Sequence, residues 1–284
     1  MKAAEWIQGL VEVPKGASAK QAKEARLARE RYVLQAVIAG LYLPIEWKRI
    51  VSTDGENTVE MWVSTDALRI GEPDDYVRVT MTQATSQRID DYLDTRALTS
   101  KVCDLIYQQA DVQLEPHTQP AAVEAGTMMK NAVLVKHSRE VDAELAGRSG
   151  LVADVSKDWT LHPILWTKPK LAVNHGWHTK RRPDPKHPEW GPYAARCGGF
   201  IWQQDGSKHN AGVPEDPDPG HYDYSQAKRL WHRMTRVNGE RIPSEIVVTD
   251  KILGPLVSWY GAMPGARHPG LPFEEPGYPL PDPE

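Results

Sequence analysis

Residues 46–65 read EWKRIVSTDGENTVEMWVST, and this stretch decides the class of fold that the sequence predicts. Apolar side chains recur at every second position on both sides of Asp54 and Gly55, as at Val59 and Met61. Such alternation is typical of a strand with one buried face, and Asp-Gly between two alternating runs is typical of a hairpin turn. The stretch therefore predicts two antiparallel strands joined at this turn.

The segments around the hairpin predict helices and further strands. Residues 18–39 begin with Ser18, a residue type favoured at helix N-caps, and apolar residues become frequent toward the end of the segment. Residues 100–110 follow Thr99, a second candidate cap, and carry an apolar side. Further helices are predicted at 83–94, at 128–145 and from Ser244 to near Gly254, and further strands at 76–82 and 229–237.

We predict an α+β fold in which helices pack on one side of a mixed, mostly antiparallel sheet. The predicted parts are an N-terminal helix and hairpin extension (1–75), a main α+β domain (76–263) and a proline-rich tail (264–284). Proline fixes φ and lacks an amide donor, so the tail can form neither a helix nor a central strand. An extended arm and a disordered end are both consistent with this composition.

The composition argues against several functional classes. The 284 residues include 34 Lys and Arg against 38 Asp and Glu, a formal net charge of -4, which disfavours general binding to nucleic acid. No apolar run approaches the roughly 20 residues that a membrane-spanning helix needs. The N-terminus shows no secretory signal and the two cysteines form no disulfide framework, so we expect synthesis in a reducing cytosol.

Reactive side chains concentrate between positions 157 and 225, where loops leaving one edge of a sheet could bring them together. In this hypothesis His178, His209 and Asp223 converge on one solvent-reachable cleft. One of the two histidines activates Ser225, and Lys157 stabilises the developing oxyanion. The expected catalytic residues are Lys157, His178, His209, Asp223 and Ser225, and the expected substrate-binding residues are Trp177, Gln203 and Tyr224.

Alternative roles remain for the same residues. His221 and Asp223 share one face of an extended segment and could ligate a metal with one of the preceding histidines, but no diagnostic spacing such as HExxH is present. We therefore predict structural histidines and no metal ligand, and the sequence specifies no cofactor. Ser225 is more commonly a turn hydroxyl than a nucleophile, and Cys197, before two glycines, is more commonly a buried packing residue.

Several short elements follow one another in order: Lys157-Asp158, Gly176-Trp177-His178, Gln203 with His209, Asp223-Tyr224-Ser225-Gln226, and Arg229-Leu230. With this order, over roughly residues 80–260, the chain resembles a largely uncharacterised bacterial and phage protein family. Members sometimes occur beside peptidoglycan-binding modules, so the resemblance implies work on the cell wall. The segment at Ser225 is also similar to the SHGCxRL element of L,D-transpeptidases. Gln226, Ala227 and Lys228 stand where that element has His, Gly and the nucleophilic Cys, which argues against transpeptidase chemistry.

The predicted function is hydrolysis of peptidoglycan, as by a phage endolysin that reaches the cell wall during lysis. Ten Trp and ten Tyr against two Phe suit a cleft that binds a polar polymer. The alternative is a non-catalytic phage virion protein or cell-wall-binding protein, with an aromatic docking face and the proline-rich tail on a neighbouring subunit. An enzyme acting on a small polar metabolite is a third alternative, without a glycine-rich phosphate loop to support it. The sequence does not specify the oligomeric state.

Overall fold

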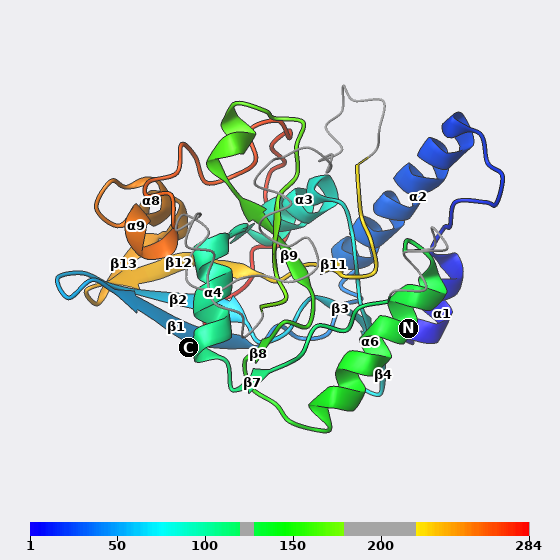
Figure 1. Ribbon diagram of the computed structural model, residues 1–284, viewed down its shortest axis with the longest axis horizontal. Coiled ribbons are helices and arrows are strands. Elements are labelled where there is room, and N and C mark those ends of the chain that lie inside the picture. Colours follow the sequence, from blue (N-terminus) through cyan, green and yellow to red (C-terminus); the bar gives the residue numbers. More distant parts are fainter. Residues whose placement is uncertain (120–127, 179–219, 284) are drawn as a thin grey trace.

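Helices and a mostly antiparallel set of strands make up the computed structural model, which describes residues 1–119, 128–178 and 220–283. The helices are α1 (Ala3–Gly9), α2 (Ala19–Ile38), α3 (Gln83–Leu93), α4 (Ser100–Gln109), α6 (Asn131–Leu145), α8 (Ser244–Thr249) and α9 (Gly254–Val257), with a 3-10 turn η1 (Pro163–Trp166). The strands are β1 (Trp47–Thr53), β2 (Thr58–Ser64), β3 (Arg69–Glu72), β4 (Asp75–Arg78), β5 (Thr95–Arg96), β6 (Leu98–Thr99), β7 (Val112–Gln113), β8 (Val152–Ala153), β9 (Lys157–Leu161), β10 (Asn174–Gly176), β11 (Gln226–Ala227), β12 (Trp231–Val237) and β13 (Glu240–Pro243). This arrangement confirms the predicted α+β class (Figure 1).

The predicted hairpin is confirmed and forms one edge of the largest sheet, whose strand order is β1-β2-β12-β13, with β5 also paired to β12. β1 and β2 are antiparallel, and Asp54 closes their turn by accepting the amides of Glu56 and Asn57 at 2.9 and 2.7 Å. β2 then pairs with β12, where Val63 lies opposite Trp231. The N-terminal hairpin therefore shares one sheet with a strand from the C-terminal part of the chain.

Alternate side chains of these strands form the centre of the largest apolar cluster. Ile50, Val59, Met61 and Val63 are each fully buried and belong to the same cluster as Val102 of α4. Because side chains alternate between the two faces of a strand, the period-two pattern of the sequence selects this buried face. A second apolar cluster joins α1, α2 and α3.

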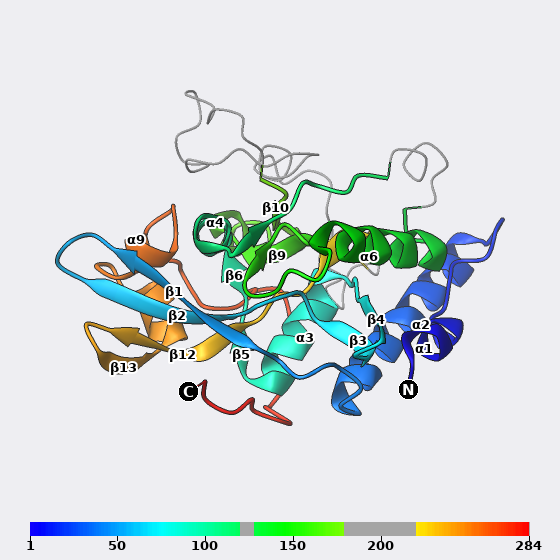
Figure 2. The same ribbon diagram turned by 90° about the horizontal axis from the view of Figure 1, so that it is seen from below.

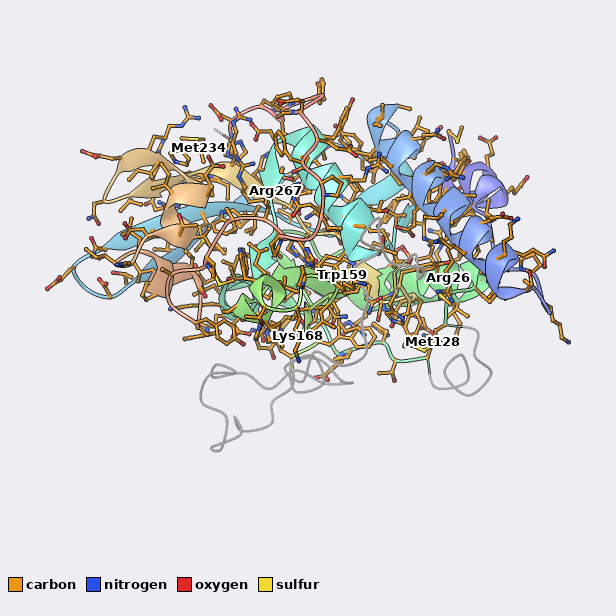
Figure 3. The ribbon with its side chains drawn as sticks, turned by 90° about the horizontal axis from the view of Figure 1, so that it is seen from above. Arg26, Met128, Trp159, Lys168, Met234 and Arg267 are labelled. Atoms are coloured by element: carbon orange, nitrogen blue, oxygen red, sulfur yellow. The ribbon has the colours of Figure 1, made fainter. Side chains whose placement is uncertain are left out.

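A smaller sheet positions the polar residues that matter for function. Its central strand β9 pairs antiparallel with β10 and parallel with β11 and β6. All five residues of β9 are buried, and Trp159 at its centre donates its indole N–H to the carbonyl of Met81 at 2.8 Å. Figure 2 shows α4 beside β10 and β9, and Figure 3 places Trp159 in the middle of the molecule.

The helices predicted at 18–39, 83–94 and 100–110 are confirmed as α2, α3 and α4. Ser18 and Thr99 accept the amides of residues three positions ahead and so begin α2 and α4 as N-caps. Within the described ranges, no helix is both long and apolar enough to cross a membrane.

The helix predicted from Ser244 to near Gly254 is interrupted. α8 ends at Thr249 because the carboxylate of Asp250 accepts the amides of the second and third residues after it, at 2.7 and 2.8 Å. Such a side-chain turn offers the backbone amides an alternative to the helix. The next helix along the chain is α9.

The proline-rich tail contains no helix or strand as far as residue 283, as predicted, and it packs against α3 of its own chain. The amides of Gly277 and Tyr278 both donate to the carbonyl of Tyr92, at 3.1 and 2.8 Å. Arg267, labelled in Figure 3, donates to the carboxylate of Asp91 at 2.6 Å. The described part of the tail is therefore an extended segment held by its own chain.

A buried arginine ties the second hairpin, β3-β4, to α6. The strand predicted at 76–82 is shorter than expected and ends at Arg78; beyond it, the amide of Met81 donates to the carbonyl of Gln226. Arg78 is 2% exposed and contacts both carboxylate oxygens of Asp66 at 2.9 and 2.7 Å. It also donates to Asp142 of α6 at 2.7 Å. Burial opposes the charge of Asp66, but Arg78 outweighs it and holds the pKa of this carboxyl below its usual value.

Replacing Arg78 by Met is expected to lower the free energy of unfolding by about 3–5 kcal/mol, because Asp66 would remain buried without its partner. Urea unfolding followed by circular dichroism measures this loss. Arg49→Met is the matched control, since Arg49 is an exposed residue of β1 that pairs with Glu60 at 2.7 Å. The control should change stability by less than about 1 kcal/mol. Similar losses in the two variants would contradict the role assigned to Arg78.

Candidate functional site

Strand β9 separates two groups of polar side chains, because successive residues of a strand point to opposite faces. Lys157 faces Asp223, and its Nζ lies 3.6 Å from a carboxylate oxygen. Asp158 lies on the other face, paired in the ladder with His175 of β10. We call the first group the lysine cluster (Lys157, His221, Asp223, Ser225) and the second group the histidine centre (Asp104, Asp154, His175, His178, Trp259).

The residues Gly176-Trp177-His178 form a sharp turn at the end of β10. Gly176 has a φ of 136°, and a Cβ at this position would lie 3.0 Å from the carbonyl of Ser156. Trp177 has a φ of 57°, which is uncommon for a bulky residue. The carboxylate of Asp154 holds the turn by accepting the amides of Trp177 and His178 at 2.8 and 2.7 Å. The turn therefore fixes where both side chains begin.

Asp104, in the middle of α4, is the central acceptor of the histidine centre. Nε2 of His175 and Nε2 of His178 lie 2.7 and 2.8 Å from its Oδ1. Its Oδ2 accepts the indole N–H of Trp259 at 2.6 Å. Nδ1 of His178 lies 2.8 Å from Asp154. Asp104, His175 and His178 are 0%, 0% and 3% exposed, so the contacts form away from bulk water.

The charges in this centre depend on one another. Burial alone would lower the pKa of His178, but Asp154 and Asp104 outweigh burial and raise it to about 10. Burial would raise the pKa of Asp104, but His175 and His178 hold it below its usual value. Without a bound metal ion, His178 is therefore an imidazolium at neutral pH. In that state it cannot act as a general base.

The same residues have the composition of a metal site. One donor atom from each of Asp104, His175 and His178 lies within 4.8 Å of the other two. Among the described residues, this is the group of three His, Cys, Asp or Glu side chains with donor atoms that close together. Two imidazoles and one carboxylate suit zinc and also iron. The centre can thus balance its buried carboxylates with a proton or with a cation.

A small cavity of about 10 Å³ adjoins the histidine centre and is lined by Asp154, Asp158 and His178, together with Arg229. A cavity of this size can hold about one water molecule. Burial raises the pKa of Asp158 to about 6, although Arg229 opposes this shift and donates its amide to the carboxylate at 2.9 Å. Asp158 is consequently a carboxyl group beside the cavity that can exchange a proton near neutral pH.

The lysine cluster is built around the turn that the sequence Asp223-Tyr224-Ser225-Gln226 forms. Oδ1 of Asp223 accepts the amide of Ser225 at 2.7 Å and its hydroxyl at 2.5 Å. Burial opposes the charge of Asp223, but Lys157 and the hydrogen bonds from His221 and Ser225 hold its pKa well below the usual range. Since this carboxylate stays ionised and cannot take the hydroxyl proton, Ser225 fits the turn role rather than that of an activated nucleophile.

The aromatic residues expected to bind substrate are buried. Trp177 and Tyr224 are 1% and 4% exposed, and their rings lie 6.2 Å apart between centroids. His137 of α6 packs against both rings at 5.9 and 5.2 Å. Nζ of Lys157 lies 5.2 Å from the centroid of the Trp177 ring. These side chains therefore connect the lysine cluster to the packed interior.

The structure thus brings together part of the predicted set. Lys157, Asp223 and Ser225 are in contact, whereas His178 belongs to the histidine centre on the other face of β9. His221 and Asp223, weighed as a ligand pair, lie 3.9 Å apart within the lysine cluster. Gln203, His209 and Cys197 lie outside the described residues.

Four residues of the histidine centre are absent from the site residues predicted from the sequence, namely Asp104, Asp154, His175 and Trp259. The segment around His175 shows its histidines openly, but Asp104 is one acidic residue within an amphipathic helix. A usable signal was its position between Cys103 and Leu105, which are both buried. An acidic residue on the inner side of a helix needs a partner, and that partner is distant in sequence.

The comparisons with known proteins add no relative. Neither the protein-family models nor the curated proteins nor the solved structures gave a match to this chain.

His137 generates a prediction about pH, because its pKa is lowered to about 3 by burial and by neighbouring positive charge. An unfolded chain protonates this histidine from about pH 6.5 downward, while the folded chain does not, so acidification favours unfolding. When the pH falls from 7 to 5, the free energy of unfolding of His137→Gln should increase by about 2 kcal/mol relative to that of wild type. Urea unfolding of both proteins at each pH measures this gain.

Between pH 7 and pH 9 the two proteins should keep a constant difference in stability, which provides the internal control. A difference that also stays constant down to pH 5 would show that His137 protonates normally in the folded protein.

Proposed function

We propose that this chain is a peptidoglycan hydrolase whose reaction takes place at the cavity between the histidine centre and Asp158. The observation that supports this proposal best is the convergence of Asp154, Asp158 and His178 on one small cavity that has room for a water molecule. A carboxylate, a water molecule and a positively charged centre are the components that hydrolysis of a carbonyl compound requires.

Backbone strain supports a functional role for this location. Asp154 and Trp177 both have left-handed φ values, 62° and 57°. Trp177 belongs to the turn that positions His178, and the carboxylate of Asp154 holds that turn. Non-glycine residues in this region are uncommon, and such strain tends to occur where side chains must be held in a particular geometry for binding or catalysis. The strain lies beside the cavity, where a precise geometry would be needed.

Asp158 is the proposed general base. Its carboxylate takes a proton from the water molecule while the water oxygen bonds to the carbonyl carbon of the substrate. The same carboxyl group returns the proton to the leaving amine when the C–N bond breaks. The imidazolium of His178, which lines the cavity, stabilises the negative charge that develops on the carbonyl oxygen.

The choice of peptidoglycan as the substrate comes from the sequence. The elements at 157–158, 176–178 and 223–226 resemble a family that occurs beside peptidoglycan-binding modules. In this proposal the protein acts on the cell-wall polymer, as a phage lysis enzyme does.

A non-catalytic role as a virion or cell-wall-binding protein is the second candidate. The near-complete burial of Asp104 and His175 favours it, because buried ion pairs can serve folding alone. The two candidates differ in whether a covalent bond of the wall polymer is broken.

Purified wild-type protein is expected to release soluble fragments from purified peptidoglycan, measured as loss of turbidity and as new free amines. Asp158→Asn should lower the rate at least about 100-fold, because an amide cannot accept the proton from water. Asp74→Asn is the matched control, since Asp74 is a largely exposed carboxylate, and its rate should equal that of wild type.

Thermal unfolding monitored by circular dichroism establishes that each variant is folded. Absence of released fragments with walls from both Gram-positive and Gram-negative bacteria would eliminate the hydrolase proposal. Cosedimentation with the walls without release of fragments would support the binding role instead. A fully active Asp158→Asn variant would contradict the role of Asp158 alone.

A further inference from the structure

We propose that Asp104, His175 and His178 bind one Zn²⁺ ion, through Oδ1 of the aspartate and Nε2 of each histidine. This inference rests on the proposed function and deepens it, because a zinc ion would direct the activity toward amide bonds, whose carbonyl groups it polarises. It also replaces the expectation from the sequence that no residue ligates a metal.

The three donor atoms are close enough for one ion. Each lies within 4.8 Å of the other two, and the two histidine nitrogens are 2.7 and 2.8 Å from the aspartate oxygen. Ligands of tetrahedral zinc at about 2.0–2.1 Å lie roughly 3.4 Å from one another. The two contacts to the aspartate oxygen would therefore lengthen by about 0.6–0.7 Å to reach the spacing that zinc requires.

In two of these side chains, His178 and Asp104, the remaining polar atom is held so that the donor points inward. Nδ1 of His178 lies 2.8 Å from Asp154, and Oδ2 of Asp104 accepts the indole N–H of Trp259 at 2.6 Å. A ring nitrogen paired with a carboxylate, with the other nitrogen free to face the ion, is the usual arrangement around histidine ligands of zinc. Asp154 and Trp259 are therefore the expected positioning residues of the site.

The charges of the site also suit a cation. Asp104 and Asp154 are both buried, and their ion-pair partners within the described ranges are imidazoles rather than Lys or Arg. Burying carboxylates is unfavourable unless a positive charge compensates them. A divalent ion supplies that charge at the point where Asp104 meets both rings.

The surroundings favour zinc over iron, which two histidines and one carboxylate can also bind. Iron sites of this kind keep several coordination positions open for oxygen and a second substrate. Here the adjoining cavity measures about 10 Å³ and leaves space for about one water molecule. Three protein ligands and one water give the four-coordinate geometry of catalytic zinc.

Metal content and affinity of the untagged, full-length protein test the proposal. Protein purified without chelator should contain about one equivalent of zinc by elemental analysis. After removal of metal, titration with Zn²⁺ against a chromophoric chelator gives the affinity. Titration with Co²⁺ should produce the visible absorption bands of a tetrahedral ion.

Variants separate the ligands from the positioning residues. Asp104→Asn and His178→Gln should each weaken zinc binding more than about 100-fold, and Asp154→Asn about 10- to 100-fold. His117→Gln is the matched control, because His117 also pairs with a carboxylate, that of Glu144 at 2.6 Å, but belongs to no such group of three among the described residues. Its zinc affinity should stay within about twofold of wild type. Circular dichroism confirms that the metal-free variants are folded.

Several outcomes would overturn the inference. The first is that wild-type protein binds less than about a tenth of an equivalent of zinc. The second is that Asp104→Asn leaves zinc affinity unchanged. The third is that the purified protein contains iron in place of zinc. Stoichiometric zinc without release of wall fragments would leave this inference standing and refute the proposed function. Lysis by metal-free protein in the presence of chelator would support the proposed function and refute a role of zinc in the reaction.

Discussion

The carboxylate of Asp154 determines the geometry on which the polar interior depends. It accepts the amides of Trp177 and His178 and lies 2.8 Å from Nδ1 of the same histidine. These contacts stabilise a turn in which Trp177 is left-handed, a conformation that would be unfavourable without such support. The turn directs Trp177 toward Lys157 and His178 toward Asp104. One side chain thus positions residues on both faces of β9, and its hydrogen bonds offset local backbone strain.

The class of fold could be predicted because its signals are local. Asp54 and Gly55 mark the first hairpin through the turn that they form, and Ser18 and Thr99 begin helices by accepting nearby amides. The interruption after Thr249 also has a local cause, the side chain of Asp250, but an aspartate inside an apolar pattern reads equally well as an exposed helical residue. What the sequence could not show is the pairing of β2 with β12, since nothing local specifies strand partners so far apart.

The candidate site was less predictable because its contacts are long-range. Asp104 meets His175 and His178 across 71 and 74 positions of the chain. The sequence analysis found the histidine-rich turn, and it expected a turn as the more common role of Ser225, which agrees with the contacts of its hydroxyl. It placed His178 and Asp223 in one group because both lie in polar loops. The alternation of β9, which sends Lys157 and Asp158 to opposite faces, separates them.

The two polar groups compensate their buried charges in different ways, and the difference bears on function. In the lysine cluster the amino group of Lys157 faces Asp223, which also accepts two hydrogen bonds from one serine. In the histidine centre, Asp104 and Asp154 face imidazoles, which become positive only by taking up a proton. A positive charge that arrives as a proton can be exchanged for another cation, whereas a lysine cannot leave. The histidine centre is therefore the group whose charge depends on proton uptake.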